Sequence, residues 1–137
     1  MRIIQLILFF FFLVSCSGCE KDPAAISPRD MLGGKTWFLE QRVVKIGQDS
    51  VRHSFLGLPT FWFKLRREDV DSSYIDSDGY VGRYRVEESV DELLLTIIQL
   101  NRGTAKSYRV TYVGYDYLVV EFDMNQYVNR LYFSSRL

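Results

Sequence analysis

The sequence predicts an all-β protein built as one eight-stranded antiparallel up-and-down barrel, which occupies residues 31–137. Three observations indicate this class: short segments alternate between apolar and polar residues, turn-forming residues separate them, and no long helix lies between them. Strands that follow one another through tight turns pair as an antiparallel meander. Eight strands with one apolar face each can close into a barrel whose interior holds side chains or one small ligand.

The predicted strands are separated by recognisable turns. Gly47-Gln48-Asp49 follows the first strand, and Asp76-Ser77-Asp78-Gly79 is the clearest hairpin turn, because Asp and Gly adopt the backbone angles that such turns need. In the third strand Phe61, Phe63 and Leu65 share one face. The eight segments, in chain order, are 37–46, 51–56, 61–66, 80–86, 92–100, 108–112, 118–122 and 127–134.

The fifth segment, 92–100, is the ambiguous one, because it is apolar on both faces and its Leu and Ile content also suits a helix. Its short length and the turns on either side favour a strand. The last three segments alternate clearly. Their residues expected on one face are Tyr108, Val110, Tyr112, Leu118, Val120, Phe122, Leu131 and Phe133.

The first fifteen residues indicate export. Arg2 precedes an apolar stretch from Ile3 to Val14 that is broken only by Gln5, and Leu13-Val14-Ser15-Cys16 follows. This arrangement resembles a bacterial lipoprotein signal peptide with its lipobox, which implies removal of residues 1–15 and acylation of Cys16. The stretch is too short for a transmembrane helix, which needs about 20 apolar residues. Cleavage without lipid attachment is the competing interpretation.

Residues 16–30 are predicted to be a flexible tether, because they contain Ser, Gly, Lys, Asp and two prolines without hydrophobic periodicity. At their end, Pro28 to Leu32 is expected to form one helical turn with Ser27 as its cap. The residue after Cys16 is Ser17 rather than Asp. By resemblance to the sorting rules of Gram-negative bacteria, this favours the outer membrane over the inner one, so we expect a lipid-anchored protein of the cell envelope.

Three motifs carry a resemblance to the small lipocalin-like lipoproteins of Gram-negative bacteria. Leu32-Gly33-Gly34-Lys35-Thr36-Trp37 is similar to their opening Leu-x-Gly-x-Trp, although two residues rather than one separate Gly34 from Trp37. The others are 78–84, with Asp-Gly-Tyr and Gly-Arg-Tyr, and 92–96, with Glu-Leu-Leu-Leu-Thr. The resemblance covers residues 32–137 and implies a barrel. It also implies a late arginine packed over Trp37, for which Arg130 and Arg136 are both candidates.

Composition excludes several classes of function. The chain has 17 basic and 17 acidic residues, so no strong field would recruit nucleic acid. No Cys/His cluster has zinc spacing, no cofactor motif is present, and neither a metal nor a cofactor is expected. His53, the only histidine, lacks a nucleophile motif and is expected to be exposed, so no enzymatic activity is predicted. The acidic residues of 68–71 and 76–78 are interpreted as parts of a solvated connection.

Aromatic residues form the one constellation that suggests a function. They are expected to point into the barrel as a wall that contacts a small apolar or amphipathic ligand. The alternative is that they fill the barrel as core, which would leave a ligand-free structural or accessory surface protein that acts through protein–protein contacts. No particular protein partner is indicated. The candidate interior residues are Trp37, Phe61, Phe63, Tyr84, Tyr108, Tyr112 and Phe122.

Replacing Cys16 with serine should leave the protein without lipid, because the lipobox resemblance places the acylated thiol at this residue. Labelling with radioactive palmitate should detect the parent protein and not Cys16→Ser. Cys19→Ser is the matched control and should label like the parent, since the residue three before Cys19 is not aliphatic. Labelling that persists in Cys16→Ser and disappears in Cys19→Ser would move the attachment site.

Overall fold

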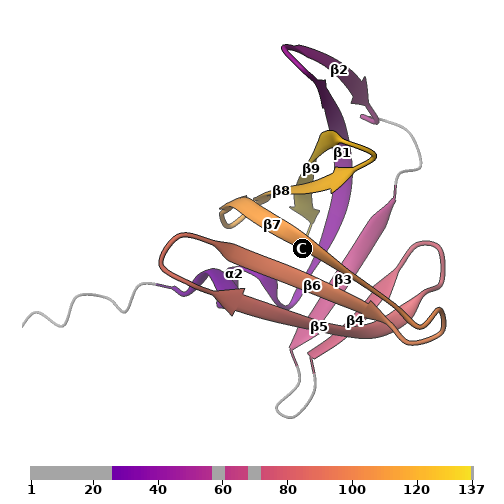
Figure 1. The fold of residues 1–137 in the computed structure, drawn as a ribbon. Helices are drawn as coiled ribbons and strands as arrows, with labels where there is room; N and C mark the ends of the chain where they lie inside the picture. The colour runs from indigo at the N-terminus through magenta and orange to yellow at the C-terminus, as the bar shows by residue number, and fades with distance from the viewer. Residues whose placement is uncertain (1–25, 57–60, 68–71, 137) are drawn as a thin grey trace, which may run out of the picture.

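The computed structural model describes residues 26–56, 61–67 and 72–136, and these form a closed antiparallel β-barrel preceded by one helical turn (Figure 1). Cys16 and the expected signal peptide lie outside the described residues. The elements are α2 (Pro28–Leu32), β1 (Lys35–Ile46), β2 (Asp49–Ser54), β3 (Trp62–Arg67), β4 (Ser72–Asp76), β5 (Val81–Glu88), β6 (Leu93–Gln99), β7 (Thr104–Val113), β8 (Tyr117–Met124) and β9 (Tyr127–Arg136).

The barrel closes because β1 pairs with two strands of the meander. From β3 to β9 each strand pairs antiparallel with the next one along the chain. β1 then pairs with β9 along one edge, from Thr36 opposite Arg136 to Lys45 opposite Val128. On its other edge the first part of β1 pairs with β3. Eight strands, β1 and β3 to β9, therefore form the closed barrel that the sequence predicts.

The membership of the barrel differs from the prediction at two strands. The predicted strand 51–56 corresponds to β2, which pairs only with the second half of β1, is exposed at every residue, and projects as an arm outside the barrel (Figure 1). Its expected place is taken by β4, which lies within the stretch that was interpreted as a connection. β4 has five residues, so alternation over so short a segment gave no distinct strand pattern.

Two β-bulges change which side chains point inward. In β1 the register shifts between Leu39 and Gln41, so that Arg42 comes to lie opposite Leu131, on the inner face. In β7 it shifts between Val110 and Tyr112. Each bulge inserts one extra residue, and after it the inward and outward positions are exchanged. Tyr112 consequently lies outside the barrel, 57% exposed, and not in the interior as expected.

The helical turn α2 closes one end of the barrel. Ser27 caps it, Pro28 is at its start, and the Ser27 side chain accepts a hydrogen bond from the Asp30 amide, as the sequence predicts. Leu32 and Trp37 are fully buried, and the Trp37 indole Nε1 donates to the Leu32 carbonyl oxygen at 3.0 Å. Because α2 is tied into the core in this way, the expected boundary between residues 30 and 31 falls inside an ordered element.

Neither of the two candidate arginines packs over the Trp37 ring. Arg136 lies over Phe38, 4.9 Å from that ring, and Arg130 pairs with Glu121. A lysine lies near Trp37 instead, because the Nζ of Lys35 is 5.6 Å from the ring centroid.

Gly82 lies where β5 and β6 approach each other closely. It points inward between Tyr84 and the β4–β5 turn, and it is buried. A Cβ atom added at this residue would nearly coincide with the Ile98 carbonyl oxygen of β6. A side chain here would force the two backbones apart, so the close approach of these strands requires glycine.

Trp37→Ala should destabilise the domain by about 3–5 kcal/mol, the usual cost of deleting a large buried aromatic side chain. Tyr112→Ala is the matched control and should cost less than about 1 kcal/mol, because its ring lies on the outer surface. Urea unfolding of both variants measures the difference. Equal losses of stability would contradict the inward position of Trp37 and the outward position of Tyr112.

Candidate functional site

A partly open apolar cavity lies inside the barrel toward the end opposite α2. We call it the pit, and it has a volume of about 40 Å³. Small-molecule sites usually measure about 300–1,000 Å³, whereas a single water needs roughly 10–15 Å³, so side chains already fill most of the interior. The pit is lined by Phe61, Phe63, Tyr74, Leu95, Ile97, Tyr108, Val120, Leu131 and Phe133.

Aromatic rings account for much of the pit wall. Phe63 lies edge-on to Phe133, with 5.0 Å between the ring centroids, and is 6.2 Å from the ring of Tyr74. Phe61 packs beside Phe63 at 6.4 Å. These rings come from β3, β4 and β9 and from the residue before β3, so the wall depends on barrel closure.

A wider and more polar pocket of about 260 Å³ lies outside the pit, and we call it the mouth. The pit and the mouth share Tyr74, Ile97 and Tyr108, so they adjoin each other. Together their volume reaches the lower end of the range for small-molecule sites. The mouth is lined by Tyr74, Ile97, Gln99, Arg102, Thr104, Ala105, Lys106 and Tyr108.

Asp76, at the end of β4, organises one side of the mouth. The expectation from the sequence that Asp76 lies in a solvated connection is wrong, because only 3% of the residue is exposed. One carboxylate oxygen accepts from the amides of Asp78 and Tyr80, both at 3.0 Å. The other accepts from the Tyr74 hydroxyl at 2.5 Å and from Gln99 Nε2 at 3.4 Å. Asp76 thus holds the β4–β5 turn against β6.

The two tyrosines at the junction of pit and mouth remain protonated at neutral pH. Burial raises the pKa of Tyr108 to about 12, and the negative charge of Asp76 acts in the same direction. The pKa of Tyr74 is also raised, by burial first and then by its hydrogen bond to Asp76. Tyr74 donates its proton to Asp76. The Tyr108 hydroxyl has no hydrogen-bond partner among the described residues, so it is a donor open to a ligand.

Two cationic side chains lie on the inner wall near the open end. Arg42 of β1 donates to the Asn129 side-chain oxygen from Nε at 3.0 Å and from Nη2 at 2.5 Å, and Asn129 is 1% exposed. Lys106 of β7 lies opposite Ile97, and its Nζ is 3.5 Å from the centroid of the Phe122 ring. Partial burial lowers the pKa of Lys106, and the positive charge of Arg42 lowers it further.

The seven candidate residues divide into three groups. Trp37, Phe63 and Tyr84 are buried in the core. Of these only Phe63 lines the pit. Phe61, Tyr108 and Phe122 are half-buried toward the open end, and Tyr112 is outside the barrel. Aromatic alternation found the wall but missed Arg42, because nothing in the sequence marks the bulge that turns it inward.

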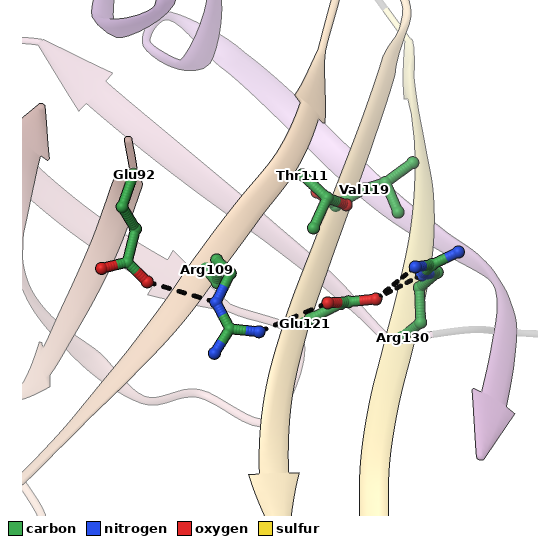
Figure 2. Close-up of polar contacts among 6 residues, drawn as sticks. All are labelled: Glu92, Arg109, Thr111, Val119, Glu121 and Arg130. Atoms are coloured by element: carbon green, nitrogen blue, oxygen red, sulfur yellow. Dashed lines mark hydrogen bonds and ion pairs between the residues drawn. The ribbon is translucent and has the colours of Figure 1, made fainter. Parts of the chain in front are cut away.

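The outer face of β7, β8 and β9 carries a row of ion pairs (Figure 2). Glu121 of β8 lies between Arg109 and Arg130, with nitrogen–oxygen distances of 3.4 and 2.5 Å. Arg109 also reaches Glu92 at 3.2 Å. The Glu121 side chain is only 10% exposed, so this carboxylate needs its partners. The row links the residue before β6 to β7, β8 and β9, and we interpret it as a structural feature of the barrel wall.

The remaining candidate features of the sequence give no further site within the described part of the chain. His53 lies exposed on β2, as expected. No group of histidine, cysteine and acidic residues could hold a metal ion among the described residues. The same residues include no helix long and apolar enough to cross a membrane. The acidic residues of 68–71 lie outside the described residues.

Comparison with known proteins adds no relative: no family model, no curated protein and no solved structure matches the chain.

Asp76→Ala should lower the free energy of unfolding by about 3 kcal/mol, because the buried Tyr74 hydroxyl and the two turn amides would lose a charged acceptor. Asp78→Ala in the same turn is the control. Its side chain is exposed, and the change should stay within about 0.5 kcal/mol of the parent. Chemical denaturation of both variants tests this, and a tolerated loss of the Asp76 carboxylate would contradict its structural role.

Proposed function

We propose that this protein is a lipid-anchored envelope protein that binds a small amphipathic molecule at the open end of its barrel. The observation that carries the proposal is the position of an apolar pit beside a polar mouth, with three residues that line both. An apolar group in the pit would contact aromatic and aliphatic side chains from several strands, while the mouth offers a free hydroxyl and charged groups. Such a division of surface suits a molecule with one apolar and one polar end.

The size of the pit limits the ligand. At about 40 Å³ it accepts only the tip of an apolar chain unless its walls move. Most of the ligand would therefore occupy the mouth and remain within reach of solvent. This favours a short or slender molecule over a bulky, fully enclosed one.

The anchoring half of the proposal rests on the lipobox at Leu13-Val14-Ser15-Cys16 and on Ser17 after it. Acylation at Cys16 would hold the domain at the membrane through the tether, with the outer membrane favoured over the inner one. Two or more acyl chains give stable attachment, whereas one chain binds only marginally. The protein would then act at a lipid surface, where amphipathic molecules are concentrated.

A second candidate function, that of an accessory surface protein without ligand, is favoured by a groove under the β1–β2 arm. This groove measures about 270 Å³, and Leu56 and Tyr117 at its edge are 70% and 61% exposed. Exposed apolar side chains beside a projecting strand suit a protein–protein contact. The mostly filled barrel interior is compatible with this function.

Leu131→Trp should abolish binding of 1-octanol, because the larger ring would fill the pit from the β9 wall. Tyr132→Trp is the matched control. It changes the next residue, which lines the groove under the arm and not the pit, and octanol binding should be kept. Protein NMR titration measures both, with unfolding curves to show that each variant is folded.

Mass spectrometry of an organic extract of the purified parent protein should also detect a co-purifying small molecule. If octanol binds Leu131→Trp as tightly as it binds the parent protein, the pit is excluded as the binding site. Binding lost in Tyr132→Trp alone would place the ligand in the groove instead.

A further inference from the structure

Arg42 and Lys106 are cations of the inner wall that have no carboxylate partner among the described residues. By contrast, Arg85 pairs with Glu87, and Arg109 and Arg130 pair with Glu121, on the outer wall. Lys106 lines the mouth, and Arg42 is opposite Leu131 of the pit.

The strand register brings the two cations to the same part of the wall. Arg42 is opposite Leu131, which lines the pit, and Lys106 is opposite Ile97, which lines both pit and mouth. Between them on β8 and β9 lie Phe122 and Asn129, which are themselves paired in the ladder. Asn129 holds the Arg42 guanidinium, and the Phe122 ring supports the Lys106 ammonium.

These two supports are neutral. Asn129 offers Arg42 only an amide oxygen, and an aromatic face attracts a cation more weakly than a carboxylate does when the site is exposed. The lowered pKa of Lys106, caused by partial burial and by Arg42, indicates that each cation acts on the other. Two like charges held close together at the edge of an apolar pit attract an anion.

The nearest inward carboxylate does not neutralise them. Asp76 is engaged by the Tyr74 hydroxyl, two turn amides and Gln99, on the opposite side of the mouth. Between the two sides stands Tyr108, whose free hydroxyl is a neutral hydrogen-bond donor. The mouth therefore offers Lys106 and one hydroxyl donor beside the pit, with Arg42 on the adjoining inner wall, while Arg102, its other cation, lies over the Tyr80 ring.

We propose that the open end of the barrel recognises the carboxylate of a small monoanionic amphiphile, bound by Lys106 of the mouth and by Arg42 on the adjoining inner wall, with the Tyr108 hydroxyl as a further donor. The proposal rests on the proposed function, since the pit would hold the apolar end of the same molecule. Arg42 keeps Nη1 free for the ligand while Nε and Nη2 remain on Asn129. Lys106 can rotate its ammonium toward the mouth, because the residue is exposed and lines that pocket.

A monoanion fits this arrangement better than a dianion. The Asp76 carboxylate is hydrogen-bonded to Tyr74 and Gln99, both of which line the mouth. A second negative charge on the ligand would therefore be repelled by Asp76. A carboxylate also matches the planar guanidinium of Arg42 in geometry.

The test compares two probes with the same eight-carbon chain, sodium octanoate and 1-octanol, by NMR titration of the purified protein. The parent should bind octanoate about tenfold more tightly than octanol, the factor that one charge-assisted hydrogen bond supplies. Lys106→Gln and Arg42→Gln should each weaken octanoate binding much more than octanol binding and so remove most of this preference. Lys106→Arg should retain it.

Lys45→Gln is the matched control for general electrostatics. Lys45 is an exposed cation of the same strand as Arg42, three residues further along and on the outer face. Its removal changes the net charge by the same amount, and the preference for octanoate should persist. A loss equal to that of Arg42→Gln would assign the preference to net charge and overturn the proposed contacts.

The remaining outcomes distinguish failure of the carboxylate site from failure of amphiphile binding as a whole. Equal binding of octanoate and octanol to the parent would overturn the carboxylate site and leave amphiphile binding in place. Absence of binding by both probes would overturn both proposals. Octanoate binding that survives in the Arg42→Gln/Lys106→Gln double variant would place the anion elsewhere on the protein.

Discussion

The pairing of β1 with β9 is the interaction on which the rest of the structure depends. It converts a meander into a closed barrel, and it removes the two edges that an open sheet would expose. Closure gathers residues from distant parts of the chain around one interior, so the pit, the buried Trp37 and the cations of the mouth all require it. The bulge at Glu40 lies within this same pairing. The pairing that closes the barrel therefore also determines that Arg42 points inward.

Periodicity was sufficient for the coarse architecture and insufficient for its irregularities. Alternating residues and Asp-Gly turns predict the strands, the barrel and the strand character of 93–99 because those features repeat along the chain. A bulge is a single extra residue with no fixed composition, so the outward position of Tyr112 and the inward position of Arg42 could not be predicted. β4 was missed because five residues are too few for a pattern.

The candidate site shows the same division between pattern and geometry. Aromatic residues at alternate positions indicated an apolar wall, and Phe61, Phe63 and Tyr108 do line the pit. The buried role of Asp76 was hidden, because Asp followed by Gly is typical of any hairpin turn. Its four hydrogen bonds come from Tyr74 of β4, from two amides of the following turn and from Gln99 of β6, and only the folded structure brings those donors together.

The β1–β2 arm has a consequence for the behaviour of this protein at high local concentration. On the edge away from β1, β2 presents backbone amides and carbonyls to which no strand of the described residues is bound. Such an edge is a template for cross-molecule strand addition and, in repetition, for fibres. β2 carries Asp49, Arg52 and His53 with a single aliphatic residue, Val51. This polar, charged sequence on a short strand protects molecules at high local concentration from joining edge to edge.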